Sequence, residues 1–419
     1  MKTLLLLISI IVLSIQPSIA QSQLKLPAEI QINWSGYEDE DSFVRIWGWS
    51  ADGTKLAYSI DSEGSGLPFI DFSIRDLRTD KELFTLYDHD GLVMITDNLV
   101  EYEKTDPTNC KPMYCDPSYA DMYNFNRTEI LNALTKYGIE RTYQKAEFFP
   151  IPSYLNGVKY SASNIKNCDA YEYDVFDFEW LLKAGDYSTI KRYRGDCGYQ
   201  KARGYFLNPQ KDRMAMLLSI QIGWGTYYEI APSLNLTFSQ PNTKLAIPPQ
   251  IDLPNVKIWG WSASNTAGLV AYSQENGEQI DFVIFDMIHD KALFAIQIDS
   301  YEANKTIILR ELFKYQIERV ENQFLTFPQV INKATYDAKL DIKYNNELIT
   351  EYEVTISRDS KAKSIGKFTA NEPVTNVSVA GILLSPFENR ALVVIAEQDG
   401  EIIRYRFSGC HLGVGFRLL

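Results

Sequence analysis

One pentapeptide, Ile-Trp-Gly-Trp-Ser, occurs twice in this chain of 419 residues, at 46–50 and again at 258–262. Three further pairs of segments repeat in the same order behind it. Residues 70–84 match 280–294 at 9 of 15 positions, and residues 126–150 match 304–328 at 12 of 25. The third pair is 207–220 and 384–397. This period is too long for a solenoid repeat, so it predicts two tandem copies of one domain.

The residue patterns predict that each copy is an antiparallel, β-rich domain with one helix, giving an α+β chain that is mainly β. The segment Pro68–Leu77 alternates apolar and polar side chains with period two, which is typical of a half-buried strand. Three blade-like units in each copy would also be compatible with a six-bladed β-propeller, which stays open as the alternative. We expect these parts: a signal peptide (1–20), a polar lead-in (21–42), repeat domain 1 (43–240) with an insertion (91–125), a proline-rich linker (241–256) and repeat domain 2 (257–419).

The first twenty residues have the composition of a secretory signal. Lys2 precedes an apolar run, and Ser18-Ile19-Ala20 has the small-x-small form that signal peptidase reads, which predicts cleavage before Gln21. No later apolar run approaches the ~18 residues that a membrane helix needs. We therefore expect a secreted or periplasmic protein whose mature chain has no transmembrane segment.

Five cysteines fit an oxidising compartment only partly, because the number is odd. Four lie in copy 1 and allow three pairings, of which we expect Cys110 with Cys115 and Cys168 with Cys197. Cys410 is left alone, and its role is open. A zinc site is the rival interpretation, but Cys-x4-Cys is poor zinc spacing. We expect neither a metal nor another cofactor.

Copy 1 carries an insertion between residues 91 and 125. The offset between copies falls from 210 at Asp71/Asp281 to 178 at Asn126/Asn304, so copy 1 has 32 additional residues (210 − 178). Tyrosine offers a large amphipathic contact area at low entropic cost, so four tyrosines in or beside this insertion are candidate binding residues. They are Tyr102, Tyr114, Tyr119 and Tyr123.

The tryptophan doublets are the second set of candidate binding residues: Trp47, Trp49, Trp259 and Trp261. Strand alternation predicts that both members of a doublet lie on one face. There they could pack in the core or stack against a glycan or peptide.

The segment after the insertion predicts a helix. Asn126 is a suitable N-cap, and Glu129 three residues later suggests a capping box. Ile130, Leu131, Leu134 and Tyr137 share one face. The Glu-Arg pair that follows, at 140–141 and again at 318–319, indicates a structural ion pair or surface charge rather than a catalytic role.

Copy 1 resembles an uncharacterised family of bacterial predicted secreted proteins, a domain of unknown function. The counterparts are GWSADGTKLAYSI (48–60), EGSGLPFIDFSIRD (63–76), TKYGI (135–139), Cys168 and GDCGYQKARGYFLNP (195–209). The segment WSADGTKLAY is also similar to the start of TolB-type propeller blades. The family resemblance implies export and a disulfide, and it brings no catalytic residues.

Catalytic motifs are absent from the sequence. Only three histidines occur, and none belongs to an HExxH motif. Asp71 and Asp76, five residues apart, face opposite sides of one strand and cannot act as an acid–base pair, so we expect a turn-bonding role for the aspartate at the strand end. A net charge of −13 without a long basic patch argues against nucleic acid. The sequence predicts an exported, non-enzymatic binding or scaffold protein of the cell envelope, whose partner is an unknown envelope protein or a glycan. A carboxylate-dependent envelope hydrolase is the alternative.

Overall fold

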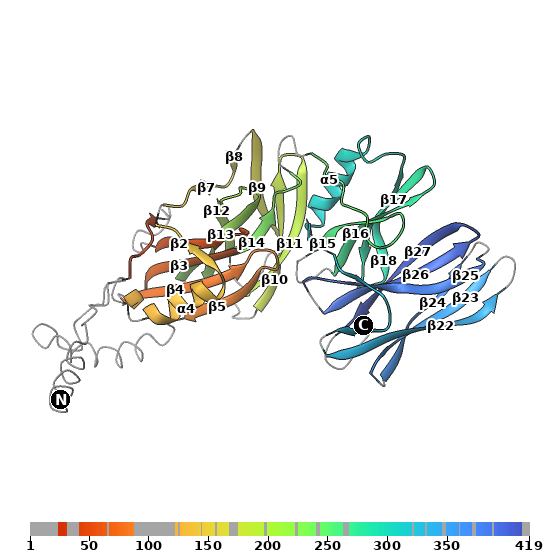
Figure 1. Cartoon of the computed structure of the whole chain (residues 1–419). Helices are drawn as coiled ribbons and strands as arrows, with labels where there is room; N and C mark the ends of the chain where they lie inside the picture. Colours follow the sequence, from red (N-terminus) through yellow and green to blue (C-terminus); the bar gives the residue numbers. More distant parts are fainter. Residues whose placement is uncertain are drawn as a thin grey trace, which may run out of the picture. The chain divides into compact units, whose positions relative to one another are not determined.

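The computed structural model, drawn in Figure 1, describes most of the chain, which divides into two compact units. Unit 1 contains Met1–Ser50, Leu56–Ile74 and Phe84–Ala146, and unit 2 contains Ala51–Lys55, Arg75–Leu83 and Glu147–Leu419. The described residues are 24–31, 42–64, 67–87, 122–124, 126–143, 145–155, 157–166, 175–196, 199–222, 225–239, 244–262, 268–320, 322–331, 333–345, 349–359, 361–370, 374–387 and 389–412. Strands dominate both units, which confirms the prediction of a mainly β chain with antiparallel sheets.

The first sheet begins in unit 1 and is an antiparallel meander, as its alternating sequence predicts. Its strands run in the order β1-β2-β3-β4-β5, and β6 pairs with the free side of β2 at Gly48–Ser50. Their bounds are β1 (Glu29–Gln31), β2 (Ser42–Ser50), β3 (Lys55–Gly64), β4 (Leu67–Asp76), β5 (Lys81–Tyr87) and β6 (Ile139–Arg141). Asp76 ends β4 and accepts hydrogen bonds from the backbone N–H groups of Arg78 and Thr79 at 2.8 and 3.3 Å, which confirms the turn-bonding role.

Helix α4 (Arg127–Lys136) lies where the sequence predicts it, and it buries Ile130, Ala133 and Leu134. The predicted capping box is wrong. The Asn126 side chain makes no cap hydrogen bond and instead donates to the carbonyl of Met122 at 3.1 Å. The short helical stretch before Asn126 therefore supplies the acceptor with which the side chain bonds.

Unit 2 begins with two antiparallel sheets of four strands each. One has the order β11-β10-β9-β8, and the other has the order β14-β13-β12-β7. The bounds are β7 (Phe148–Pro150), β8 (Ser153–Leu155), β9 (Val158–Lys166), β10 (Val175–Ala184), β11 (Tyr187–Asp196), β12 (Tyr199–Leu207), β13 (Arg213–Ile222) and β14 (Gly225–Asn235).

The described part of unit 2 contains three more sheets and helix α5. The sheet orders are β18-β17-β16-β15-β19, β20-β25-β26-β27 and β21-β22-β23-β24. The bounds are β15 (Val256–Ser262), β16 (Leu269–Asn276), β17 (Gln279–Asp286), β18 (Lys291–Ile298), α5 (Lys305–Lys314), β19 (Ile317–Glu318), β20 (Phe324–Leu325), β21 (Gln329–Ile331), β22 (Ala334–Asn345), β23 (Thr350–Arg358), β24 (Lys361–Ala370), β25 (Asn376–Leu384), β26 (Arg390–Asp399) and β27 (Ile402–His411).

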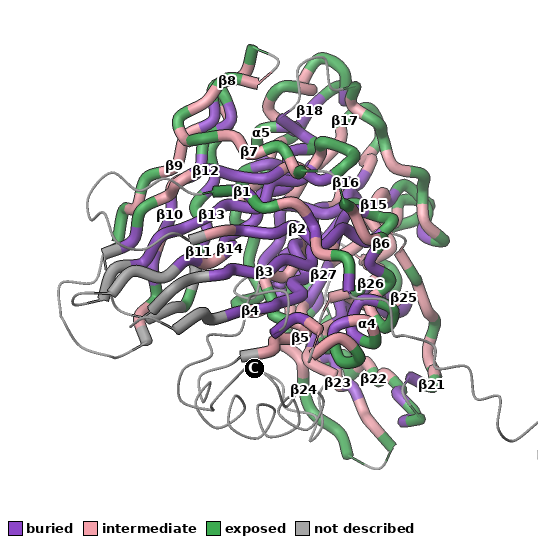
Figure 2. Tube along the Cα trace, turned by 90° about the vertical axis from the view of Figure 1, so that its left-hand side faces the viewer, coloured by how far each residue is buried: buried purple, intermediate pink, exposed green. Residues whose placement is uncertain are grey.

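The largest core cluster of unit 2 joins residues from both sides of the 241–256 segment. It includes Trp180 and Leu218 before that segment, and Trp259 and Phe313 after it. Helix α5 packs on β11, where Thr189 Oγ1 donates to the carbonyl of Lys314 at 2.7 Å. Buried residues follow one another along strands such as β26, whereas β22 has an exposed second half (Figure 2). The compact units therefore do not coincide with the two sequence repeats.

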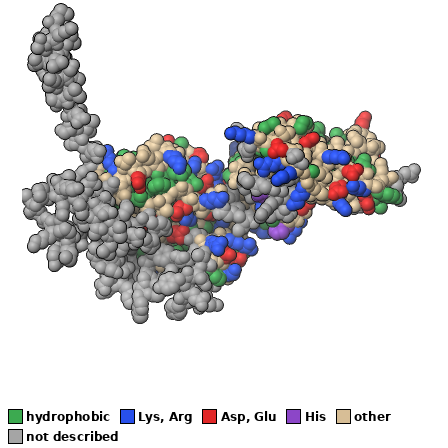
Figure 3. Space-filling view, turned by 90° about the horizontal axis from the view of Figure 1, so that it is seen from below, with side chains coloured by type: hydrophobic (Ala, Val, Ile, Leu, Met, Phe, Trp, Pro, Cys, Tyr) green, Lys and Arg blue, Asp and Glu red, His purple; other side chains and the backbone are tan. Residues whose placement is uncertain are grey.

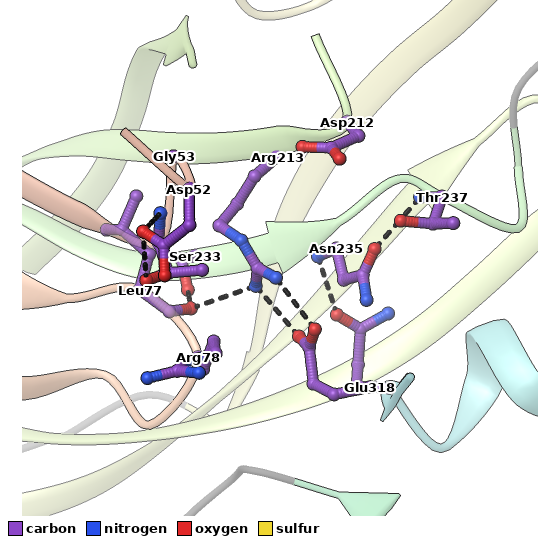
Figure 4. Close-up of polar contacts among 12 residues, drawn as sticks. Asp52, Gly53, Leu77, Arg78, Asp212, Arg213, Ser233, Asn235, Thr237 and Glu318 are labelled. Atoms are coloured by element: carbon purple, nitrogen blue, oxygen red, sulfur yellow. Dashed lines mark hydrogen bonds and ion pairs between the residues drawn. The ribbon is translucent and has the colours of Figure 1, made fainter. Parts of the chain in front are cut away.

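A buried ion pair within unit 2 also crosses that segment (Figure 4). Arg213, at the start of β13, donates two hydrogen bonds to the carboxylate of Glu318 at 2.8 and 2.7 Å. Both side chains are under 10% exposed, at 7% and 9%. Arg213 also lies 3.5 Å from the carbonyl of Leu77, to which Ser233 donates. Burial lowers the pKa of Arg213, but the charge and hydrogen bonds of Glu318 together with the charges of Asp212 and Asp76 more than offset it, so the net pKa is raised.

Candidate functional site

The first candidate residues, the tryptophans, are buried in cores and not displayed on the surface. Trp47, Trp259 and Trp261 are at most 1% exposed, and Trp49 is 7% exposed. The prediction that both members of a doublet share one face is wrong for the second doublet. Trp259 and Trp261 belong to different core clusters, because a β-bulge at Gly260 breaks the alternation of β15.

Tyr123 is also a core residue, which removes it from the surface contacts expected of the insertion. Its hydroxyl donates to the carboxylate of Asp61 and accepts from the Ser59 hydroxyl at 2.5 Å, and its ring packs 5.2 Å from that of Trp47. Burial raises the pKa of Asp61, partly offset by Arg45, and holds the pKa of Tyr123 well above its usual value. Strongly shifted groups often mark functional sites. Here, however, the whole cluster is closed to solvent.

An equivalent cluster occurs in the sheet of β15–β19, which argues that both are scaffolds. Trp259 Nε1 donates to Ser273 Oγ at 3.0 Å, just as Trp47 Nε1 donates to Ser59 Oγ at 3.0 Å. Tyr301 bonds with the same Ser273 hydroxyl at 2.9 Å. A shared internal framework is explained by folding, so a candidate site has to be sought elsewhere.

Seven residues that the sequence singled out lie outside the described residues. They are Tyr102, Tyr114, Tyr119, Cys110, Cys115, Cys168 and Cys197. The expected contacts of the insertion and both expected disulfides therefore stay predictions. Cys410 is described, and its thiol is free and buried.

Unit 2 contains an open pocket of about 640 Å³ beside β15, and sequence reasoning missed it. The proline-rich segment forms one wall, and the chain that follows β19 forms the other. Its lining is Ile247, Pro248, Pro249, Gln250, Ile251, Asp252, Ile258, Trp259, Arg319, Val320, Asn322 and Phe324. This volume falls within the range of small-molecule sites.

The segment that we predicted as a linker is held as a pocket wall by three backbone contacts. Gln250 forms an isolated antiparallel bridge with Lys257. The N–H of Ile251 donates to the carbonyl of Val256 at 3.2 Å, and the carbonyl of Ala246 accepts from the Arg319 side chain. Leu253 and Val256 are buried in the adjoining core. The prolines stiffen this wall, because each fixes its own backbone φ.

Arg319 provides the positive charge of the pocket. Its guanidinium lies 5.9 Å from the centre of the Trp259 ring and 5.5 Å from that of Phe238. Burial lowers its pKa. Among the described residues no carboxylate lies within 4 Å of it, whereas the preceding Glu318 is fully engaged with Arg213. The predicted structural role of the Glu-Arg pair is thus confirmed for Glu318 and does not account for Arg319.

The pocket combines apolar walls, side-chain amides and one cation. Asn322 accepts from Trp261 Nε1 at 2.6 Å, which fixes its side chain at the rim. Asp252 is the one carboxylate among the described lining residues. Apolar walls with a few polar groups that can orient a ligand are typical of binding sites.

The rest of the described chain adds little chemistry. His289 pairs with Asp286 at 2.7 Å, and its side chain is 64% exposed. No group of three or more His, Cys, Asp or Glu residues in the described part could hold a metal. Within the same part, no helix has the length and hydropathy to cross a bilayer. Acidic and basic side chains are interspersed on the face that Figure 3 shows.

Comparisons with known proteins indicate no function, so the functional inference depends on the geometry of this pocket. No model of a known protein family matches the chain, and a search of curated proteins finds no match either.

Proposed function

We propose that this protein is an exported, non-enzymatic binding protein of the cell envelope, and that it takes a ligand in the pocket beside β15. The observation that carries the proposal is the lining itself: apolar walls, two amides and one cation without a carboxylate partner among the described residues. Sites with such a lining bind and orient small molecules. The carboxylate-dependent hydrolase has less support, because Asp252 is the one carboxylate among the lining residues that the structure describes.

Nile red, a neutral dye that fluoresces in apolar surroundings, tests whether the pocket binds. We expect saturable fluorescence with the full-length mature protein and its loss in Gln250→Trp, where the indole fills the pocket. The matched control is Lys244→Trp, an exposed position in the same segment outside the lining. Equal dye binding by both variants would refute the pocket as the site.

We further propose that the fold consists of two tandem copies of one domain, each with one helix. It is supported by equivalent details in the two meanders. Gly48 and Gly260 sit at β-bulges with φ of 154° and 145°, and the carbonyls of Glu140 and Glu318 approach them in the same way. The propeller alternative has less support, because propeller blades have four strands and these two sheets have six and five.

We also propose from the sequence that the protein is exported. Residues 1–20 would be removed as a signal peptide, as the resemblance of copy 1 to predicted secreted proteins also implies. The intact mass of the exported protein tests both this cleavage and the two expected disulfides. A mass that retains residues 1–20 would contradict the export of this chain by that route.

A further inference from the structure

We propose that Arg319 makes the pocket selective for a ligand that carries a carboxylate on an apolar body. The inference rests on the proposed binding function, and it adds the chemical class of the ligand. Three observations carry it: the guanidinium without a carboxylate partner among the described residues, the composition of the walls, and a contrast with the equivalent arginine of the first meander.

The surroundings of Arg319 leave donors available for a ligand. One Nη2 N–H donates to the carbonyl of Ala246, and the rings of Trp259 and Phe238 lie near the guanidinium. A guanidinium has five N–H donors in a planar fork that matches the two oxygens of a carboxylate. The backbone bond and the rings therefore fix the orientation of the group and leave most of its donors to face other acceptors.

The charges of the lining favour a monoanion. One carboxylate neutralises the single charge of Arg319, whereas a dianion such as phosphate leaves an excess negative charge in a pocket that already contains Asp252. The apolar body would lie against Ile247, Ile251 and Phe324. Burial of such a body contributes affinity in proportion to its area.

Arg141, the equivalent residue in unit 1, is held in a similar way but does not belong to the pocket lining. Its guanidinium also lies 5.9 Å from a tryptophan ring, that of Trp47, and its Nη2 donates to the carbonyl of Lys25 at 2.8 Å. A second ring, that of Tyr143, packs 5.0 Å from it, as the ring of Phe238 does 5.5 Å from Arg319. Lys25 in turn lies over Tyr143. The repeated geometry explains how the arginine is held, and the chain thus supplies its own control position.

The test compares N-acetyl-L-phenylalanine with its neutral amide by isothermal titration of the mature protein. The two probes differ only in the carboxylate. We expect the acid to bind at least about tenfold more tightly than the amide, because a charge-assisted hydrogen bond contributes more than a neutral one. Arg319→Gln should abolish this preference, and Arg141→Gln should retain it. Arg319→Lys, which keeps the charge and loses the fork, should retain only part of it.

Each outcome discriminates. Octanoate binding with the same dependence on Arg319 would support a fatty acid as the source of the carboxylate, and its absence beside binding of the acid would support a peptide terminus. Equal affinity for acid and amide, a preference that survives Arg319→Gln, or displacement of the acid by inorganic phosphate would overturn the inference. Such a result with intact Nile red binding refutes only the ligand class, whereas loss of pocket-dependent dye binding refutes the proposed function itself.

Discussion

Glu318→Ala should destabilise unit 2 strongly, because it leaves the guanidinium of Arg213 buried without its counter-charge. Removing one partner of a buried ion pair costs about 3–5 kcal/mol. This pair belongs in that class, since the two side chains are 7% and 9% exposed and share hydrogen bonds of 2.8 and 2.7 Å. The remaining contact of the guanidinium, with the carbonyl of Leu77, is long at 3.5 Å.

Urea denaturation followed by circular dichroism measures the loss, and calorimetry measures the accompanying fall in Tm. We expect the Tm to fall by about 6–20 °C, given roughly 2–4 °C per kcal/mol for domains of this size class. Glu140→Ala is the matched control. Glu140 occupies the equivalent position after α4, and its side chain is exposed, so its loss should change stability by about 0.5 kcal/mol or less.

The double variant Arg213→Met/Glu318→Leu separates an ion-pair effect from a packing effect. Replacing both charges by apolar groups of similar volume is often neutral or stabilising. We therefore expect the double variant to recover most of the stability lost in Glu318→Ala. A single loss below about 1 kcal/mol, or a double variant as unstable as the sum of the two single ones, would show that this reasoning about the pair is wrong.

Two further predictions concern the backbone at Gly260 and the thiol of Cys410. Gly260→Ala should cost about 3 kcal/mol or more in urea denaturation, because a Cβ there would lie 2.1 Å from the carbonyl oxygen of Glu318 at a φ of 145°. Gly277→Ala, with positive φ and open space, should cost about 1 kcal/mol, and equal losses would contradict the steric argument. Burial raises the pKa of the Cys410 thiol to about 12, so native protein should show no more thiol reactive with Ellman's reagent than native Cys410→Ser. After unfolding, the protein should show one more reactive thiol than the unfolded variant. The same shift makes stability fall as the pH rises above 9.0, and a native excess of one thiol would refute the burial.

Local patterns in the sequence predicted the local structure well. Period-two alternation located β4, and the aspartate at its end bonds with the following turn as expected of Asp76. The buried face of α4 followed from helical spacing at Ile130 and Leu134. These features depend on residues that are neighbours along the chain, and so one sequence is sufficient to predict them.

Features that depend on distant residues were not predicted. The glycine between Trp259 and Trp261 signals a bulge only when the approach of the Glu318 carbonyl is known. The proline-rich segment has the composition of a linker, and it becomes a pocket wall through contacts with β15 and with Arg319, about 70 residues later. The partner of Arg213 lies 105 residues further along the chain, a separation that no local pattern encodes.

That separation has a consequence for a chain that is still being synthesised. At roughly 5–20 residues per second, about 5–20 s pass between the emergence of Arg213 and that of Glu318. During this interval β13 can pair with β12 and β14, but its arginine has no counter-charge and β11 has no α5 to pack against it. A nascent chain that ends at the proline-rich segment therefore exposes apolar surface that a chaperone or protease can recognise. The core that contains Trp180 and Phe313 is therefore completed only after α5 and β19 emerge.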